Sequence, residues 1–178
     1  MDKLRIFDED ATLLKSLNGN QEIQAELSEV GVRFEQWSAD REISSDATQE
    51  QIIEAYQAEI DRLRQEEGYQ TCDVVSLTSE HPEKSAFRNK FITEHTHSED
   101  EVRFFVKGQG LFILHIGDKV YSVLCQKDDL ISVPAHTPHW FDMGSMPEFT
   151  CIRLFNNTEG WVAKYTESGI DEAFPTLD

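Results

Sequence analysis

Apolar residues in the first third of the chain recur at the spacing of an amphipathic helix. Segment 20–31 has this pattern, with Asn20 as its predicted N-cap. Segment 48–68 has it too, and Thr48 begins a capping-box sequence there. The repeating positions are Ile23, Leu27 and Val30, then Ile52, Tyr56, Ile60 and Leu63. We therefore expect the N-terminal part of the chain, about residues 8–68, to be largely helical.

From Cys72 onward, short runs rich in β-branched and aromatic residues replace the helical pattern. Turn-forming residues separate these runs at positions 108–110, 117–119 and 127–129. Many short strands joined by tight turns predict a small antiparallel β-barrel or sandwich over about residues 72–156, with helices added on its N-terminal side. The predicted strands are CDVVSLT, FITEHTH, VRFFVK, LFILHI, VYSVLCQ, LISVP and FTCIRLF.

The length of 178 residues suits one domain with its own hydrophobic core, and no internal repeat is visible. We therefore expect a single domain over residues 1–178. The acidic tail over about residues 167–178 has little hydrophobic pattern, which predicts weak order there.

The balance of charges excludes several classes of partner. The chain has 34 acidic residues against 16 Lys and Arg, which gives a formal net charge of -18. Such a charge repels phosphate backbones and anionic lipids, so we expect neither nucleic acid nor a membrane as a partner. The sequence has neither an apolar run long enough to span a bilayer nor the apolar core of a secretory signal. These features predict a cytoplasmic protein, and the charge favours a monomer.

Two pairs of histidines are the strongest candidates for chemistry. In a strand, the period of two puts His95 and His97 on one face, where both imidazoles can enter the same cavity. Glu101 follows a short acidic turn and can bring a carboxylate back toward them. A further ligand from a distant strand can come from His136 or His139 in the segment PAHTPHWFD. Any one of these histidines alone would more often be an ordinary core or surface residue.

Three imidazoles and one carboxylate together are a donor set that suits a divalent first-row metal. In octahedral geometry this set leaves two adjacent positions for substrate or oxygen. A structural zinc site would more often have four closed, cysteine-rich ligands, which this sequence does not provide nearby. The pattern therefore predicts a catalytic metal centre rather than a structural one.

The spacing H-x-H-x3-E-x6-G, formed by His95, His97, Glu101 and Gly108, resembles the first motif of the cupins, whose fold is a double-stranded β-helix. A closer resemblance, over nearly the full chain, is to the acireductone dioxygenases of methionine salvage. The stretches that carry it are GVRFEQW, HTHSEDEVRFFVKGQGLFILH, VPAHTPHWFDMG and the later GW. The resemblance implies that His95, His97, Glu101 and His139 are the metal ligands and that His136 is not one.

The same resemblance implies a reaction. The expected substrates are the acireductone 1,2-dihydroxy-3-keto-5-methylthiopentene and molecular oxygen, and the expected cofactor is one iron(II) or nickel(II) ion per chain. The iron form would give formate and 4-methylthio-2-oxobutanoate. The nickel form would give formate, carbon monoxide and 3-methylthiopropionate.

Other residues are expected around the metal. Arg103 shares strand parity with Glu101, so its fixed charge can face the cavity and stabilise a substrate anion. Phe91 and Phe141 share strand faces with the histidines, so they can form an apolar wall for the methylthioalkyl tail. Trp161 enters as a pocket residue by resemblance alone. The general base stays open: Glu94 has the opposite parity, and Asp100 lies in the turn.

Two alternatives remain on the sequence. One is another metal-dependent cupin enzyme, such as a flavonol dioxygenase or a sugar-phosphate isomerase, because one ligand set serves several chemistries. The other is a non-catalytic cupin with an idle metal site. An inward arginine beside the metal argues against the second alternative.

Overall fold

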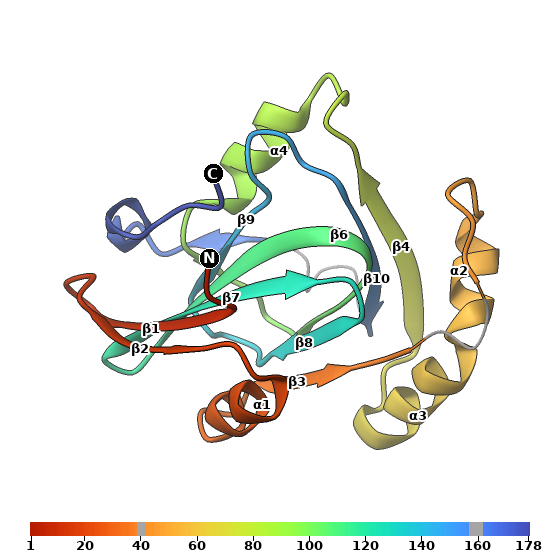
Figure 1. The fold of residues 1–178 in the computed structure, drawn as a ribbon, viewed down its shortest axis with the longest axis horizontal. Helices are drawn as coiled ribbons and strands as arrows, with labels where there is room; N and C mark the ends of the chain where they lie inside the picture. Colours follow the sequence, from red (N-terminus) through yellow and green to blue (C-terminus); the bar gives the residue numbers. More distant parts are fainter. Residues whose placement is uncertain (39–41, 157–161) are drawn as a thin grey trace.

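The structure is a computed structural model that describes residues 1–38, 42–156 and 162–178, and it is mainly antiparallel β-sheet (Figure 1). The strands are β1 (Leu4–Asp8), β2 (Leu13–Leu17), β3 (Arg33–Gln36), β4 (Thr71–Leu77), β5 (His95–Thr96), β6 (Glu101–Ile116), β7 (Lys119–Gln126), β8 (Asp129–Val133), β9 (His139–Asp142), β10 (Phe149–Phe155) and β11 (Lys164–Tyr165). The helices are α1 (Asn20–Ser28), α2 (Gln49–Ala55), α3 (Gln57–Glu67) and α4 (Lys84–Phe91), and a 3-10 helix, η2, covers Ile170–Ala173. The predicted β-rich fold with added helices is confirmed.

The long strand β6 belongs to two sheets and joins them. Its first half pairs with β8 and β10, and beyond them lie β3 and β4. Its second half pairs with β7 and β9, in a sheet with the order β11-β5-β9-β6-β7-β1-β2. The main core lies between these two layers and includes Ile6, Phe105, Phe112 and Ile131. β6 therefore fixes how the two sheets face each other.

Glycines at the middle of β6 make the change of sheet possible. Gly108 has a φ of +75°, and a Cβ there would lie 1.8 Å from the carbonyl oxygen of Glu148. A Cβ on Gly110 would lie 2.3 Å from the ring of Phe141. The expected turn at 108–110 is therefore wrong: the chain bends here but stays in the strand, because glycine tolerates both the positive φ and the close approach.

Two helices cover the outer face of the sheet that contains β4, as Figure 1 shows for α2 and α3. The predicted capping box at Thr48 is present, with Gln51 as its other member, and Gly68, at the end of the predicted segment, ends α3 in the left-handed conformation. The predicted helix breaks at Tyr56, which is buried against Phe104, with 4.7 Å between the ring centroids. Packing of this aromatic ring thus divides one expected helix into two.

The N-terminal part is less helical than expected. Strands β2 and β3 lie within the range 8–68, so the prediction of a largely helical segment there is wrong in part. Strand β2 escapes detection because it lies at the end of its sheet with Leu13 and Leu14 each 52% exposed. The N-cap of α1 is Gly19 rather than Asn20, and it makes no side-chain cap.

The C-terminal tail packs against the body of the protein, which corrects the expectation of weak order over 167–178. Phe174 is buried, and its ring lies 5.4 Å from that of Phe7 and 5.9 Å from that of Trp140. The backbone amide of Leu177 donates to Asp142 at 2.8 Å. These contacts bury the aromatic ring of Phe174, which the acidic composition of the tail did not predict.

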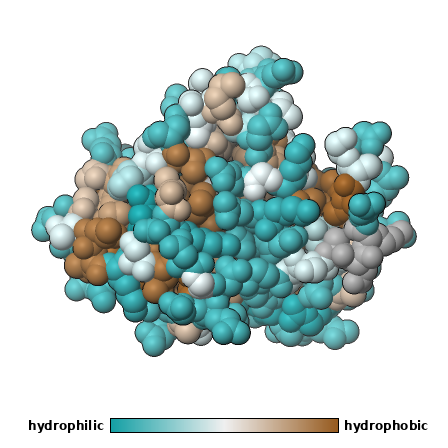
Figure 2. Space-filling view, viewed as in Figure 1, coloured by the Kyte–Doolittle hydropathy of each residue, from teal (hydrophilic) through white to brown (hydrophobic). Residues whose placement is uncertain are grey.

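The surface is polar over much of its extent. Figure 2 shows hydrophilic residues across a large part of one face, with smaller hydrophobic groups between them. In the described parts of the chain, no helix is long and apolar enough to cross a membrane.

Candidate metal centre

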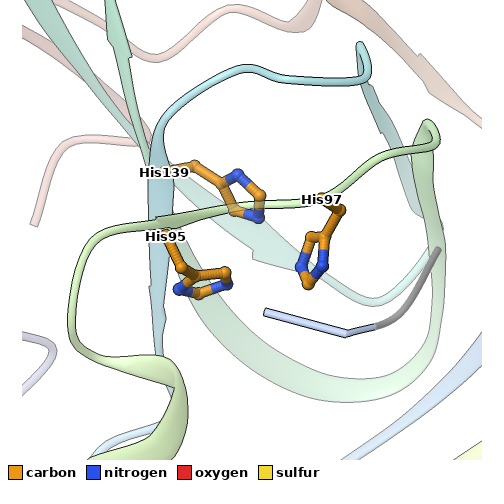
Figure 3. A group of neighbouring side chains, drawn as sticks. All are labelled: His95, His97 and His139. Carbon is orange, nitrogen blue, oxygen red and sulfur yellow. The ribbon is translucent and has the colours of Figure 1, made fainter. Parts of the chain in front are cut away.

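Three histidines from neighbouring segments come together in the interior (Figure 3). His95 in β5 lies directly across from His139 in β9, in register. His97 follows β5, and its ring lies 4.9 Å from that of His95 and 5.2 Å from that of His139. One ring nitrogen from each residue can be chosen so that all lie within 4.8 Å of one another. The predicted trio is therefore assembled in space.

Backbone carbonyls orient all of these imidazoles in the same way. A carbonyl oxygen can only accept a hydrogen bond, so each Nδ1 donates and Nε2 is the nitrogen left to bind a metal. This outer hydrogen bond is the usual partner of a metal-binding histidine. The contacts run from Nδ1 of His95 to Thr93 O at 2.7 Å, of His97 to Val162 O at 3.2 Å, and of His139 to Thr137 O at 2.8 Å.

Glu101, at the start of β6, adds a carboxylate to this group. Its Oε2 lies 2.7 Å from Nε2 of His139 and 3.2 Å from Nε2 of His97. Burial raises the pKa of Glu101, but the charge of His139 and hydrogen bonds from His139 and His97 outweigh burial and hold the pKa well below its ordinary value. The carboxylate is therefore ionised and lies among the Nε2 atoms.

The histidines respond to this environment in different ways. Burial, followed by the nearby charge of His139, lowers the pKa of His95 to about 4, so its imidazole is neutral at neutral pH. Burial also lowers the pKa of His139, but the carboxylate of Glu101 outweighs it and raises the pKa. A metal at this point would replace the proton that His139 and Glu101 share.

The donor set fits a divalent metal ion. His95, His97, Glu101 and His139 are all buried, with exposures of 5% or less. Buried polar groups of this kind are costly unless each is paired, and a cation at their common point would satisfy all of them. The fold thus brings together a buried divalent metal site.

Arg103 lies two residues further along β6, on the same side of the strand as Glu101. Its Nε donates to Oε1 of Glu101 at 3.1 Å, and its side chain is largely buried. Arg103 and Glu101 therefore lie on one face of β6, as their strand parity predicted. The guanidinium sits beside the carboxylate that faces the histidines.

A cavity of about 270 Å³ opens beside the metal centre. Glu101, His95 and Arg103 form its polar end, and most of the remaining wall is aromatic or aliphatic. Both Phe91 and Phe141 line it, as expected. Phe91 reaches it from the last residue of helix α4 rather than from a strand, because only His95–Thr96 of the predicted run FITEHTH is extended.

Several lining residues were not identified from the sequence. They are Val75, Ser76, Leu77, His81, Phe87, Phe112, Met143, Phe149, Cys151 and Arg153. Those on β4 and β10 face the cavity because these strands pair with each other and β10 pairs with β6. A pairing between strands so far apart in sequence leaves no local signal.

The remaining candidates lie elsewhere. His136 is exposed in a turn with φ of +66° and lies outside the histidine trio. Glu94 is buried but bonds to His115, Thr166 and Ser168. Asp100 accepts hydrogen bonds from Tyr69 and from the amide of Ala135.

Among the described residues that line the cavity, neither Glu94 nor Asp100 is included. Both acids are held by other partners, so the geometry does not select either one as a general base. Trp161 lies outside the described residues.

Comparison with known proteins agrees with this geometry. The profile of the ARD/ARD' family matches residues 3–163. An acireductone dioxygenase of Klebsiella oxytoca is 57% identical, over 99% of both chains. One from Marinobacter nauticus is 63% identical over 88% of this chain and 84% of its own. A solved acireductone dioxygenase from Bacillus anthracis, with a cadmium ion in its active centre, is 30% identical, covers 93% of this chain and 99% of its own, and superposes with a TM-score of 0.79.

Proposed function

The chain belongs to the ARD/ARD' family, and we propose that it is a metal-dependent dioxygenase that cleaves an acireductone with molecular oxygen. The observation that carries this proposal is the convergence of three imidazoles and Glu101 beside a largely apolar cavity, which His95, Glu101 and Arg103 line. Such a site can bind a small anionic enediol at its polar end and an apolar tail at the other. We propose 1,2-dihydroxy-3-keto-5-methylthiopentene as the substrate, in methionine salvage.

We propose His95, His97, Glu101 and His139 as the metal ligands. Iron(II) or nickel(II), one ion per chain, would supply a Lewis-acid centre for the two enediol oxygens. The carbonyls behind the imidazoles keep each Nε2 aimed at the ion, and the carboxylate lowers the net charge of the site. Hydrogen bonds to backbone carbonyls thus fix the orientation of the proposed histidine ligands.

We assign to Arg103 the binding and stabilisation of the substrate anion. Its contact with Glu101 fixes the guanidinium at the polar end of the cavity. A fixed cation in a buried site stabilises negative charge on the substrate more strongly than it would in water. Because arginine stays protonated, this charge is present at every physiological pH.

Phe91 and Phe141 are proposed to contact the methylthioalkyl tail. Both line the cavity, and the ring of Phe141 packs 4.7 Å from that of Phe112. An aromatic wall excludes water from the polar end, which strengthens the electrostatic contacts there. Trp161 is proposed as a further substrate contact by family resemblance. The cytoplasm and a monomeric state are proposed from the acidic composition.

The deciding experiment loads the metal-free protein separately with iron(II) and nickel(II) and measures oxygen uptake with the synthetic acireductone. Iron protein should give formate and 4-methylthio-2-oxobutanoate, and nickel protein should give formate, carbon monoxide and 3-methylthiopropionate. The metal-free protein is the control. If neither loaded form consumes oxygen with this substrate, the proposed reaction is wrong.

A further inference from the structure

A second arginine lies on the cavity wall, on strand β10, which pairs with the strand β6 that carries Glu101 and Arg103. Arg153 in β10 lies directly across from Arg103 in β6 and from Asp73 in β4, so the three residues form one row over three strands. Residues in such a row have side chains on the same face of the sheet. Arg153 therefore belongs to the same cavity as Arg103, and both line it.

Each of the two arginines has its own carboxylate. Nε of Arg153 donates to Asp73 at 2.7 Å, and its Nη2 donates to the other oxygen of the same carboxylate. Arg103 is held by Glu101 instead. Like charges placed directly across two strands repel each other, so the pairing of Arg103 with Arg153 lowers the stability of the sheet. The two arginines therefore indicate that positive charge at this position has a function other than stability.

The pair of Arg153 and Asp73 is oriented with respect to the cavity. Arg153 is among the residues that line the cavity, and Asp73 is not. Asp73 is also the more exposed partner, with 30% of its side chain accessible against 23% for Arg153. The guanidinium of Arg153 therefore lines the cavity, whereas the carboxylate of Asp73, on the same face of the sheet, lies beyond the lining.

An anionic substrate meets an unfavourable field around the whole protein, because the net charge is -18. The described residues that line the cavity include two arginines, Arg103 and Arg153, and no lysine. A local positive potential inside a cleft raises the capture rate of an anion. We propose that Arg153 is a substrate-capture residue, which draws the enediol anion into the cavity and binds it before the reaction.

This inference rests on the proposed function, and it separates the roles of the two arginines. Arg103 contacts a proposed metal ligand, so its loss should affect the chemical step. Arg153 has its carboxylate partner on β4, away from the histidines. Its loss should therefore lower kcat/KM through a higher KM, with little change in kcat.

The test compares Arg153→Gln with wild type at matched iron content, by steady-state oxygen uptake over a range of salt concentrations. We expect kcat/KM to fall by about tenfold or more at low salt, with kcat within about twofold of wild type. The dependence of kcat/KM on salt should weaken. Arg153→Lys, which keeps the charge, should recover most of the loss.

Asp73→Asn is the matched control, because it breaks the same ion pair but keeps the arginine. If Arg153 acts by its charge, this variant should have kcat/KM equal to or above that of wild type. If Asp73→Asn loses as much as Arg153→Gln, the pair acts only by holding β4 to β10 and the proposal is wrong. Thermal melts of all variants check folding.

Anaerobic calorimetry with the acireductone and iron-loaded protein gives a second readout without turnover. Arg153→Gln should bind the substrate about tenfold more weakly than wild type. A wild type that neither binds nor oxidises the acireductone would remove the proposed function and this inference with it. A wild type that does both, beside an Arg153→Gln protein with unchanged affinity and kcat/KM, would remove the inference alone.

Discussion

Two buried glutamates flank β5, and both contact histidines, but their surroundings differ. Around Glu101, His97 and His139 direct Nε2 toward the carboxylate, while backbone carbonyls occupy their Nδ1 atoms. Around Glu94, His115 contacts carboxylates through both ring nitrogens, at 3.1 Å to Glu94 and 2.8 Å to Glu9. The two clusters thus differ in where Nε2 points, and a partly buried histidine beside a carboxylate does not by itself make a metal site.

The cluster around Glu94 has a different use. Glu9 follows β1, His115 is near the end of β6, and Glu94 also accepts hydrogen bonds from Thr166 and Ser168 of the C-terminal tail. Glu94 thus contacts the middle and the end of the chain, and His115 connects it to Glu9 near the beginning. We interpret this cluster as structural and the cluster around Glu101 as the functional site.

The largest expected effect is loss of metal from the Glu101 centre alone. His139→Ala removes an Nε2 from the common point, so the purified variant should lose most of its bound metal and its oxygen uptake. His115→Ala, which removes a partly buried histidine from the other cluster, should keep its metal. Metal analysis of both proteins, beside melts with and without added iron(II), makes the measurement, since bound metal raises Tm.

His136→Ala is a second control for this prediction. His136 is exposed and lies three residues from His139, so removal of its imidazole should leave metal content unchanged. Equal metal loss in His136→Ala and His139→Ala would contradict the ligand assignment in this segment. Equal loss in His115→Ala would contradict the comparison of the two clusters.

A smaller effect is expected from Arg103, which contacts Glu101 but is not a ligand. Arg103→Ala should retain its metal and lose roughly a hundredfold or more in kcat, the scale for removal of one electrostatic stabiliser. Arg103→Lys should recover part of this loss, because a point charge lacks the planar fork. Oxygen uptake at matched iron content tests it, and wild-type turnover in folded Arg103→Ala would remove the residue from the mechanism.

The Glu94 cluster should respond through stability. Glu94→Gln weakens hydrogen bonds that the buried carboxylate accepts from Thr166 and Ser168, so unfolding free energy should fall by about 1–3 kcal/mol. Metal content at saturating iron(II) should stay at the wild-type level. Denaturant unfolding and metal analysis measure the two properties, and a stable Glu94→Gln protein that lacks metal would reverse the interpretation of this cluster.

The smallest effect is expected at the outer end of the same cluster. Glu9 is exposed, and exposed ion pairs contribute little to stability. Glu9→Gln should therefore change the free energy of unfolding by less than about 0.5 kcal/mol. A larger loss in the same denaturant experiment would mean that the His115 contact matters more than its exposure suggests.

The sequence was most informative where a local pattern decides geometry. The spacing of His95, His97 and Glu101 and the parity of Arg103 with Glu101 both agree with the structure. The same parity argument predicted the wrong element for Phe91, which ends a helix and still reaches the cavity. Local patterns therefore identified the polar end of the site better than its apolar wall.

Properties that depend on distant pairing were not predictable. Arg153 faces the cavity because β10 pairs with β6, and residue spacing within the FTCIRLF run cannot show this register. Strand β2 has exposed leucines, so it lacks the alternation that marks a half-buried strand. Tyr56 breaks a helix because of tertiary packing on Phe104, which overrides helical periodicity.

Because β6 is shared by both sheets, the proposed metal site cannot be completed early in synthesis of the chain. Glu101 starts the half of β6 that pairs with β8 and β10, and His139 follows it by 38 residues, on a strand that pairs with the other half. A nascent chain that ends before β9 contains His95, His97 and Glu101 but lacks His139. Such a chain would hold any divalent ion weakly, since long-range pairing must precede ligand convergence. With the proposed ligands, truncated products that lack His139 should therefore not sequester the metal.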